Sequence, residues 1–273
     1  MNFNNKILVL ITLVSLAIAS CKKEKTQPIF DDKNLAPLSI EFDHIVAGQK
    51  LYINTGNYIN TSGEPYSISL LQYFVSNITV SKADGTVYVV PQDSSYFLIK
   101  EETGVIAKAQ VYVPEGDYSS ITFTVGVDSL RSTMDITRRT GVLDPTGGMD
   151  DGMYWGWNSG YIFFKMEGLS TAAPLDPSGQ NKFRFHIGGF GGYSAPTVNN
   201  LKTITINLSE RGVAMVRKGR NSNVHLLVDI GKVMDGTKNI KIEENPTVMF
   251  SDFSKQIAEN YTQMFVHDHT END

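Results

Sequence analysis

A central segment holds the side chains of this sequence best suited to unusual chemistry. It contains the only two tryptophans, Trp155 and Trp157, together with the thioethers of Met149 and Met153. Glycine and aspartate dominate its first half, which predicts a loop, whereas residues 161–167 are largely aromatic and predict a strand. Binding residues often lie on loops held by a rigid scaffold, so this loop is the first candidate for a functional site. The alternative is that both tryptophans are core side chains that cap one end of the fold.

The histidines are the other candidates for binding a metal. The chain has five of them and one cysteine, Cys21, which has a different expected role (below). Imidazole is then the best remaining ligand for copper, and thioethers suit Cu(I). His44 ends a strand and His186 is followed at once by a glycine-rich turn, so both could reach a site at a loop end. Each could equally be a polar residue that ends a strand, and His267 and His269 are expected in a fraying tail.

Charge and motifs argue against several classes of function. The formal net charge of −5 argues against a nucleic-acid partner held through phosphate contacts. No HExxH, GxSxG, Walker or Rossmann motif is present, and no nucleophile stands beside an obvious base, so we expect no enzymatic activity. Asp144, Asp150 and Asp151 miss the spacing of an EF-hand, and turn-forming aspartates explain them better than a calcium site does.

The N-terminus predicts export and a lipid anchor. Lys6 precedes an apolar run over residues 7–19 that is too short to span a bilayer comfortably. The run ends in small residues before Cys21, which resembles the lipobox of a bacterial lipoprotein. We therefore expect residues 1–20 to be a signal peptide, Cys21 to be the acylated N-terminus and residues 21–37 to be a flexible tether. The protein would then be anchored to a membrane of the cell envelope, in the outer membrane and facing the periplasm or the surface.

Alternating strands should position the histidines. In residues 38–44 the apolar side chains and His44 share one face. In residues 182–187 and 224–230 the apolar side chains again share a face, but His186 and His225 lie on the opposite one.

The remaining pattern completes the expected fold. About ten short strand-like segments separated by turns predict an all-β fold. A helical stripe of apolar residues over 253–265 predicts one amphipathic helix near the C-terminus. We expect a single β-sandwich-like domain over residues 38–273 with this helix packed on an edge or an end.

Several segments together resemble the MbnP family of exported, β-rich proteins, which is named for a copper-binding partner of methanobactin operons. The most specific segments are a Met-Tyr-Trp-x-Trp sequence and a later Phe-His-x-Gly-Gly sequence. The residues that carry the resemblance are Phe42-Asp43-His44, Tyr73-Phe74-Val75-Ser76-Asn77-Ile78, Gly126-Val127-Asp128, Gly152-Met153-Tyr154-Trp155-Gly156-Trp157-Asn158-Ser159-Gly160-Tyr161, Lys165-Met166-Glu167-Gly168 and Phe185-His186-Ile187-Gly188-Gly189.

The resemblance implies copper, usually Cu(I), bound by two histidines and a kynurenine made from a tryptophan by a partner di-haem peroxidase of the MauG type. On this chain it implies His44 and His186 as ligands, with Trp155 or Trp157 as the oxidised residue or as a cation–π neighbour. By their chemistry alone, Met149 and Met153 are weaker candidates as soft neighbours.

Two other functions remain as alternatives. A non-catalytic binding or adhesion module would use the tryptophan loop to hold a glycan or protein, with exposed, coplanar aromatics and histidines locked in hydrogen bonds. An oxidative enzyme would need an open coordination position and a channel leading to it. Ring nitrogens of His44 and His186 more than about 6 Å apart would count against a shared copper ion.

Overall fold

The computed structural model describes residues 33–146, 152–157 and 160–273. The expected signal peptide, Cys21, most of the expected tether and Met149 lie outside the described residues. In the described part, β1 begins at Leu35, three residues before the expected start of the domain, because Ala36 is already a fully buried core residue. No helix in these three ranges is long and apolar enough to cross a membrane.

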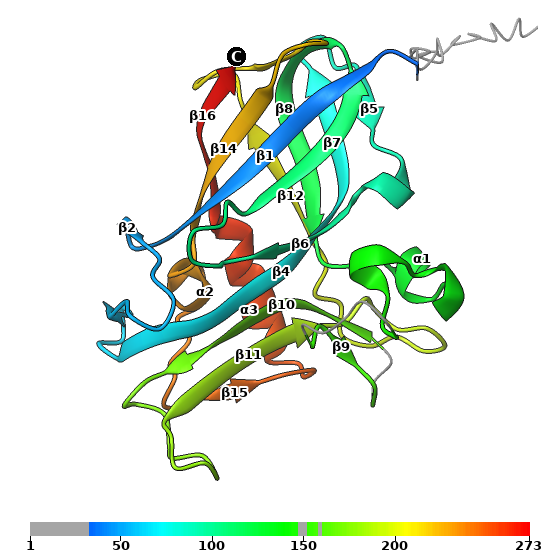
Figure 1. Ribbon diagram of the computed structural model, residues 1–273. Coiled ribbons are helices and arrows are strands. Elements are labelled where there is room, and N and C mark those ends of the chain that lie inside the picture. The colour runs from blue at the N-terminus through cyan, green and yellow to red at the C-terminus, as the bar shows by residue number, and fades with distance from the viewer. Residues whose placement is uncertain (1–32, 147–151, 158–159) are drawn as a thin grey trace, which may run out of the picture.

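The first sheet has five strands with β1 near its centre. β1 pairs in parallel with β14 and antiparallel with β7 and β2, and β16 pairs antiparallel with β14. Figure 1 shows the long strands β16, β14, β1 and β7 side by side in the upper half of the molecule. The bounds are β1 (Leu35–Val46), β2 (Gln49–Lys50), β7 (Lys108–Pro114), β14 (Ser222–Asp229) and β16 (Phe265–Asn272).

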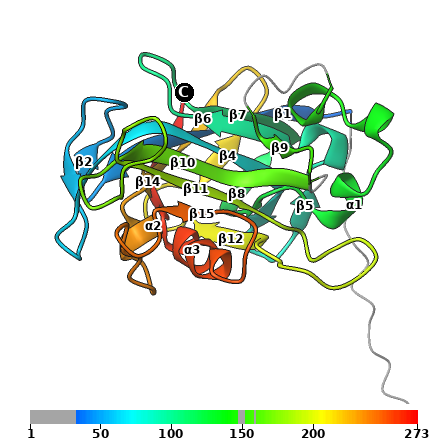
Figure 2. The same cartoon turned by 90° about the horizontal axis from the view of Figure 1, so that it is seen from below.

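The second sheet has eleven strands and is built on the long strand β4. The first half of β4 pairs with β10 and its second half with β8. Figure 2 shows β10, β11 and β15 following one another across the lower side. The strands are β3 (Tyr58–Ile59), β4 (Pro65–Lys82), β5 (Val87–Val89), β6 (Tyr96–Lys100), β8 (Gly116–Val125), β9 (Tyr154–Trp155), β10 (Gly160–Leu169), β11 (Lys182–Gly188), β12 (Lys202–Asn207), β13 (Ala214–Val216) and β15 (Thr247–Val248).

The main core lies between the two sheets. Phe42 of β1 and Phe265 of β16 meet Tyr73 of β4 and Phe123 of β8 edge to face, with ring centroids 5.1 to 6.2 Å apart. Buried and half-buried residues alternate along the whole of β1, so one face of this strand lines the core. The expected β-sandwich-like fold is confirmed.

A second apolar cluster covers the other face of the larger sheet. Consecutive side chains of a strand point to opposite faces. Accordingly, Tyr73 belongs to the main core, whereas Phe74 belongs to the second cluster together with Trp155 and Tyr161. This cluster places the tryptophan segment on the side of the sheet that faces away from the main core.

The helices are short, and the C-terminal one differs in part from the prediction. The expected helix exists as α3 and continues as the 3-10 turn η4. The chain then forms β16, so the expected polar tail is wrong: backbone pairing with β14 and burial of Phe265 and His267 make it a strand. The helical elements are η1 (Gln92–Ser94), α1 (Ser129–Ser132), η2 (Ile136–Arg138), η3 (Gly141–Leu143), α2 (Lys232–Asp235), α3 (Ser254–Asn260) and η4 (Tyr261–Gln263).

Candidate functional site

The two tryptophans form a pair in which one ring is buried and the other is exposed. Trp155 lies on β9, opposite Gly160 of β10, and is 6% exposed, whereas Trp157 is 67% exposed. Their ring centroids are 5.3 Å apart at an interplanar angle of 42°, and Trp155 also meets the edge of Phe250 at 6.2 Å. The alternative of a core residue therefore describes Trp155 but not Trp157.

The sequence makes room for the Trp155 ring by placing a glycine beneath it. A Cβ atom at Gly188 would lie 2.7 Å from the Trp155 ring and 2.3 Å from the Tyr161 carbonyl oxygen, closer than real Cβ atoms come. Met153 is fully buried in the same cluster as Trp155. The tryptophan segment is thus packed firmly on the sheet, and Trp157 presents the free aromatic surface.

His186 lies on the sheet face that carries the tryptophan segment. Its neighbours Phe185 and Ile187 belong to the main core, so its own side chain points the other way, as the alternation predicts. The opposite residue on β10, Lys165, points to the same side and donates from Nζ to the Gly152 carbonyl, 3.3 Å away. Because Gly152 precedes Met153, these contacts join the surroundings of His186 to the tryptophan segment.

A carboxylate holds the His186 ring. His186 Nε2 lies 2.7 Å from Oε1 of Glu167. The hydrogen bond from His186 is the largest influence on Glu167 and holds the pKa of this carboxyl below its ordinary value. Because Nε2 is hydrogen-bonded to the carboxylate, Nδ1 is the ring nitrogen that can bind a ligand.

His44 lies in the main core at the end of the apolar row, as predicted. Its Nδ1 is 2.7 Å from Glu101 Oε2, and its Nε2 is 3.0 Å from the hydroxyl of Tyr73. Burial, together with the charge of Glu101, raises the pKa of Tyr73 well above its ordinary value, so Tyr73 is a phenol that donates to His44. Both ring nitrogens of His44 are therefore engaged in hydrogen bonds, with Nδ1–H donating to Glu101.

The structure does not bring His44 and His186 together. His44 contacts Tyr73 on the core face of β4, and Phe164, which is opposite Tyr73, lies on that same face. Lys165 and His186 point to the other face. The sheet itself separates the two histidines that were expected to share copper. All five histidines are among the described residues, and His186 is the one that shares a face with the tryptophans.

A cavity of about 700 Å³ opens beside His44. The loop from Glu101 to Ala107, the end of β1 and residues 50–53 form its walls, which include Asp43 and Tyr52. Glu101 and His44 line the cavity, and together with Tyr73 they form a carboxylate–imidazole–phenol chain. This chain joins β1, β4 and the loop after β6, and it is fully hydrogen-bonded as it stands.

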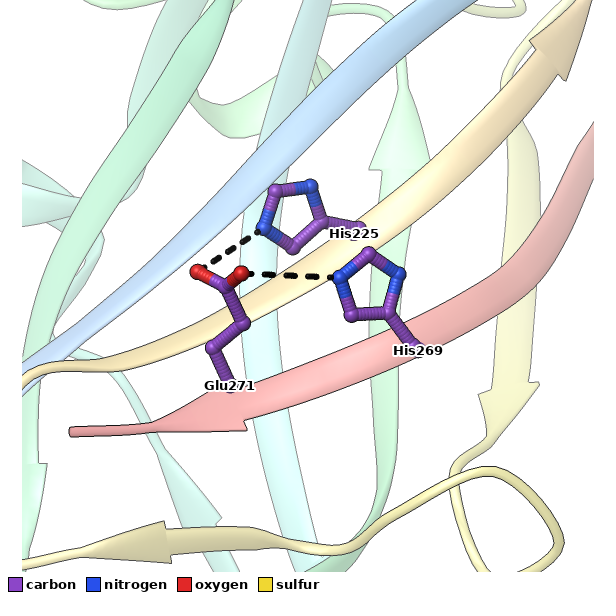
Figure 3. A group of neighbouring side chains, drawn as sticks. All are labelled: His225, His269 and Glu271. Atoms are coloured by element: carbon purple, nitrogen blue, oxygen red, sulfur yellow. Dashed lines mark ion pairs between the residues drawn. The ribbon is translucent and has the colours of Figure 1, made fainter.

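Two further histidines, on the outer face of the first sheet, were not predicted to form a site. His225 of β14 and His269 of β16 stack with ring centroids 4.3 Å apart and an interplanar angle of 10°, and Glu271 lies beside them (Figure 3). The alternation of β14 had already placed His225 on the outer face. His269 was overlooked because its segment was expected to be a frayed tail, although the His-x-Glu spacing of 269 and 271 is that of one strand face.

Comparisons with known proteins agree on one family. The MbnP family model matches residues 35–250. The solved structure of MbnP from Methylosinus trichosporium aligns with a TM-score of 0.53 over 80% of this chain and 82% of that chain, at 14% sequence identity, which is a likeness of fold. No curated protein sequence matches. The family model spans most of the described strands, from the start of β1 to the segment before α3, and the chain therefore belongs to the MbnP family.

Proposed function

We propose that this chain is a copper-binding lipoprotein of the bacterial cell envelope, held to the membrane through lipidated Cys21. The observation that carries the proposal is the close pair of Trp155 and Trp157 on the sheet face that also carries His186. An imidazole nitrogen and the faces of indole rings are suitable partners for Cu(I), which prefers soft ligands. Membership of the MbnP family supports the same function.

Within this proposal the two tryptophans have different roles. Trp157 is exposed and therefore accessible to another protein, whereas Trp155 is buried against Phe250 and the sheet. Trp157 is the residue that a di-haem peroxidase of the MauG type would oxidise. Such a peroxidase would use two molecules of hydrogen peroxide, each reduced to water, to add two oxygen atoms and cleave the C2–C3 bond of the indole. Hydrolysis of the resulting N-formyl group would release formate and leave kynurenine. The carbonyl and amine of kynurenine would then add donor atoms on the sheet face that carries His186.

His44 is assigned a structural role instead. Its ring nitrogens already bind Glu101 and Tyr73, and the larger sheet separates it from the tryptophan pair. Copper binding at the tryptophan face is therefore proposed to use His186, whereas His44 connects the two sheets.

The test is copper content and peptide mass on the mature protein purified from its native host. We expect about one copper ion per chain, and a net gain of one oxygen atom with loss of one carbon atom on the peptide that holds Trp157. Trp157→Phe and His186→Gln should each weaken copper binding by at least roughly 10-fold. Tyr112→Phe, an exposed aromatic residue on β7, serves as the control and should bind as the parent does.

The His44→Gln variant decides between the two ligand sets. Retention of copper in this variant supports the site on the tryptophan face. Loss of copper in His44→Gln, together with unchanged copper binding in His186→Gln, would contradict that site. It would show that His44, and not His186, is a copper ligand.

One observation favours the alternative of a metal-free binding module. Trp157 offers a large exposed aromatic surface, which suits the face of a sugar or an apolar side chain of a partner. The two indole rings are tilted by 42° rather than coplanar, and one is buried, which fits that module less well. Unmodified tryptophan, with no copper bound even after Cu(I) is offered, would support the module and contradict the copper proposal.

A further inference from the structure

The outer face of the first sheet carries a group of histidines and carboxylates from three adjacent strands. His225 of β14 is directly opposite His269 of β16, and Glu271 follows two residues later on the same strand. β14 lies between β16 and β1, and Glu41 and Asp43 project from β1. Figure 3 shows the carboxylate of Glu271 beside the two imidazole rings, with one oxygen directed at each ring.

A β-bulge in β16 brings His269 to this face. His267 pairs with Leu226 and His269 pairs with the preceding residue, His225, so Asp268 is an extra residue in the strand. In a regular strand, residues two apart share a face. Because of the bulge, His267 is buried in the core, whereas His269 points outward beside His225.

The distances between these side chains are those of metal ligands. Glu271 Oε2 lies 3.5 Å from His225 Nε2, and Glu271 Oε1 lies 3.7 Å from His269 Nε2. Ligand atoms of the three residues all lie within 4.8 Å of one another. Tetrahedral bonds of about 2.0–2.1 Å place ligand atoms roughly 3.3 Å apart, so small movements would close the group around an ion.

A second observation concerns the other nitrogen of each ring. His225 Nδ1 lies 3.4 Å from Asp43 Oδ2 and 3.8 Å from Glu41 Oε1. His269 Nδ1 lies 2.9 Å from Asp268 Oδ2. Both histidines thus place Nδ1 against a carboxylate and direct Nε2 toward Glu271. Metal-binding histidines are held in this way, because a carboxylate that accepts from one ring nitrogen fixes the proton there and leaves the other lone pair for the metal.

We propose that His225 Nε2, His269 Nε2 and the Glu271 carboxylate form a binding site for a divalent transition-metal ion. Two imidazoles and one carboxylate are borderline ligands that suit Zn²⁺, Ni²⁺ or Cu²⁺ better than Cu(I). The side chains of His269 and Glu271 are 48% and 50% exposed, so an ion can enter from solvent and keep a water molecule as its fourth ligand. The site is independent of the tryptophan face, which belongs to the other sheet.

Asn223 competes for one of the ligand atoms. Its Nδ2 lies 2.9 Å from His225 Nε2 and 2.9 Å from Glu41 Oε2. The amide therefore donates to the lone pair that the metal requires, and an ion must displace it. If the group binds a metal, removing the amide should strengthen metal binding. A group of side chains with only a structural role would not show this effect.

Isothermal titration of the mature chain with Zn²⁺ tests the site. Zn²⁺ is the probe because it is redox-inert and harder than Cu(I). We expect the parent to bind about one Zn²⁺ ion at this group. His269→Gln and Glu271→Gln should each bind at least roughly 10- to 100-fold more weakly, and Asp268→Asn, which replaces the carboxylate beside His269 Nδ1 with a neutral amide, about 10-fold more weakly. Asn223→Ala should bind Zn²⁺ more tightly than the parent, because the competing amide is gone.

Glu102→Gln, which removes an exposed carboxylate outside this group, is the control. It should bind Zn²⁺ as the parent does. Circular dichroism checks the fold of each variant, and the exposure of His269 and Glu271 favours folded variants. Zn²⁺ affinity equal to that of the parent in both His269→Gln and Glu271→Gln would overturn the site. Failure of the copper proposal would appear separately, as Cu(I) binding that is indifferent to Trp157→Phe.

Discussion

A buried carboxylate, Glu64, shows how the fold uses an ionised side chain for structure. Its Oε2 accepts from Asn60 Nδ2 at 2.6 Å and from the Ile242 N–H at 2.7 Å, and its Oε1 accepts from the Glu243 N–H at 2.8 Å. Burial alone would raise the pKa of Glu64, but these hydrogen bonds outweigh it, and the pKa lies below its ordinary value. Both oxygens are occupied, so Glu64 is a structural residue.

Replacing this carboxylate should therefore destabilise the protein in a pH-dependent way. A group with a lowered pKa stabilises the folded state above its unfolded pKa, about 4.3 for glutamate, and this stabilisation is lost as the pH falls through the folded value. We expect Glu64→Gln to lower the free energy of unfolding by about 1.5–3 kcal/mol near neutral pH, and less at acidic pH. Urea unfolding over a pH series measures this. The exposed Glu102→Gln is the control, and a deficit in Glu64→Gln that stays constant with pH would contradict the explanation.

The sequence predicted the strand face of each histidine better than it predicted which histidines lie close together. Alternation correctly placed His44 with the apolar side chains and His186 opposite them, because it reflects a property of each strand alone. Whether two histidines meet depends on which strands pair and on how the two sheets pack. Tyr73 and Lys165 show that His44, from the first sheet, contacts the core face of the larger sheet, whereas His186 projects from the opposite face of that sheet, and no local pattern carries this information.

At the level of elements, Gly188 at the end of β11 provides the space for Trp155. Gly188→Ala would push a Cβ into the Tyr161 carbonyl and the Trp155 ring. We expect it to lower the free energy of unfolding by about 1–3 kcal/mol, the usual cost of overpacking. Thermal unfolding followed by tryptophan fluorescence measures both the stability and the displacement of the ring.

Gly156 is a matched control for this variant, because it lies between the two tryptophans. A Cβ there would meet nothing within 4 Å, so Gly156→Ala should leave the stability close to that of the parent. Equal destabilisation by both substitutions would contradict the packing argument, since it would point to backbone flexibility instead.

The elements themselves were predictable where a simple period held. The strands of the sandwich and the C-terminal helix follow from alternation and from the helical stripe. β16 was missed because its polar residues alternate only weakly and the bulge at Asp268 interrupts the period. Its stability as a strand comes from pairing with β14, a long-range partner that local patterns do not reveal.

At the scale of the whole molecule, the two candidate sites lie on the outer faces of different sheets. The soft, aromatic surface of Trp155 and Trp157 covers the larger sheet, whereas the imidazoles and carboxylates around His225 lie on the smaller one. The main core separates them. Under the two proposals above, ligands of different softness at separate places would let one chain bind Cu(I) and a divalent ion without competition between the sites.

The proposed anchor can be tested on the whole molecule without disturbing either site. Cys21→Ser removes the thiol that would carry the acyl chains, whose burial in a bilayer contributes about 0.8 kcal/mol per CH₂ group. We expect this variant to leave the membrane pellet and to appear in the soluble envelope fraction, whereas Lys22→Ala stays in the pellet. Copper and Zn²⁺ binding per chain should be unchanged, because both candidate sites lie in residues far along the chain from Cys21. A Cys21→Ser protein that remains in the pellet after a carbonate wash would show that something other than this cysteine holds the chain to the membrane.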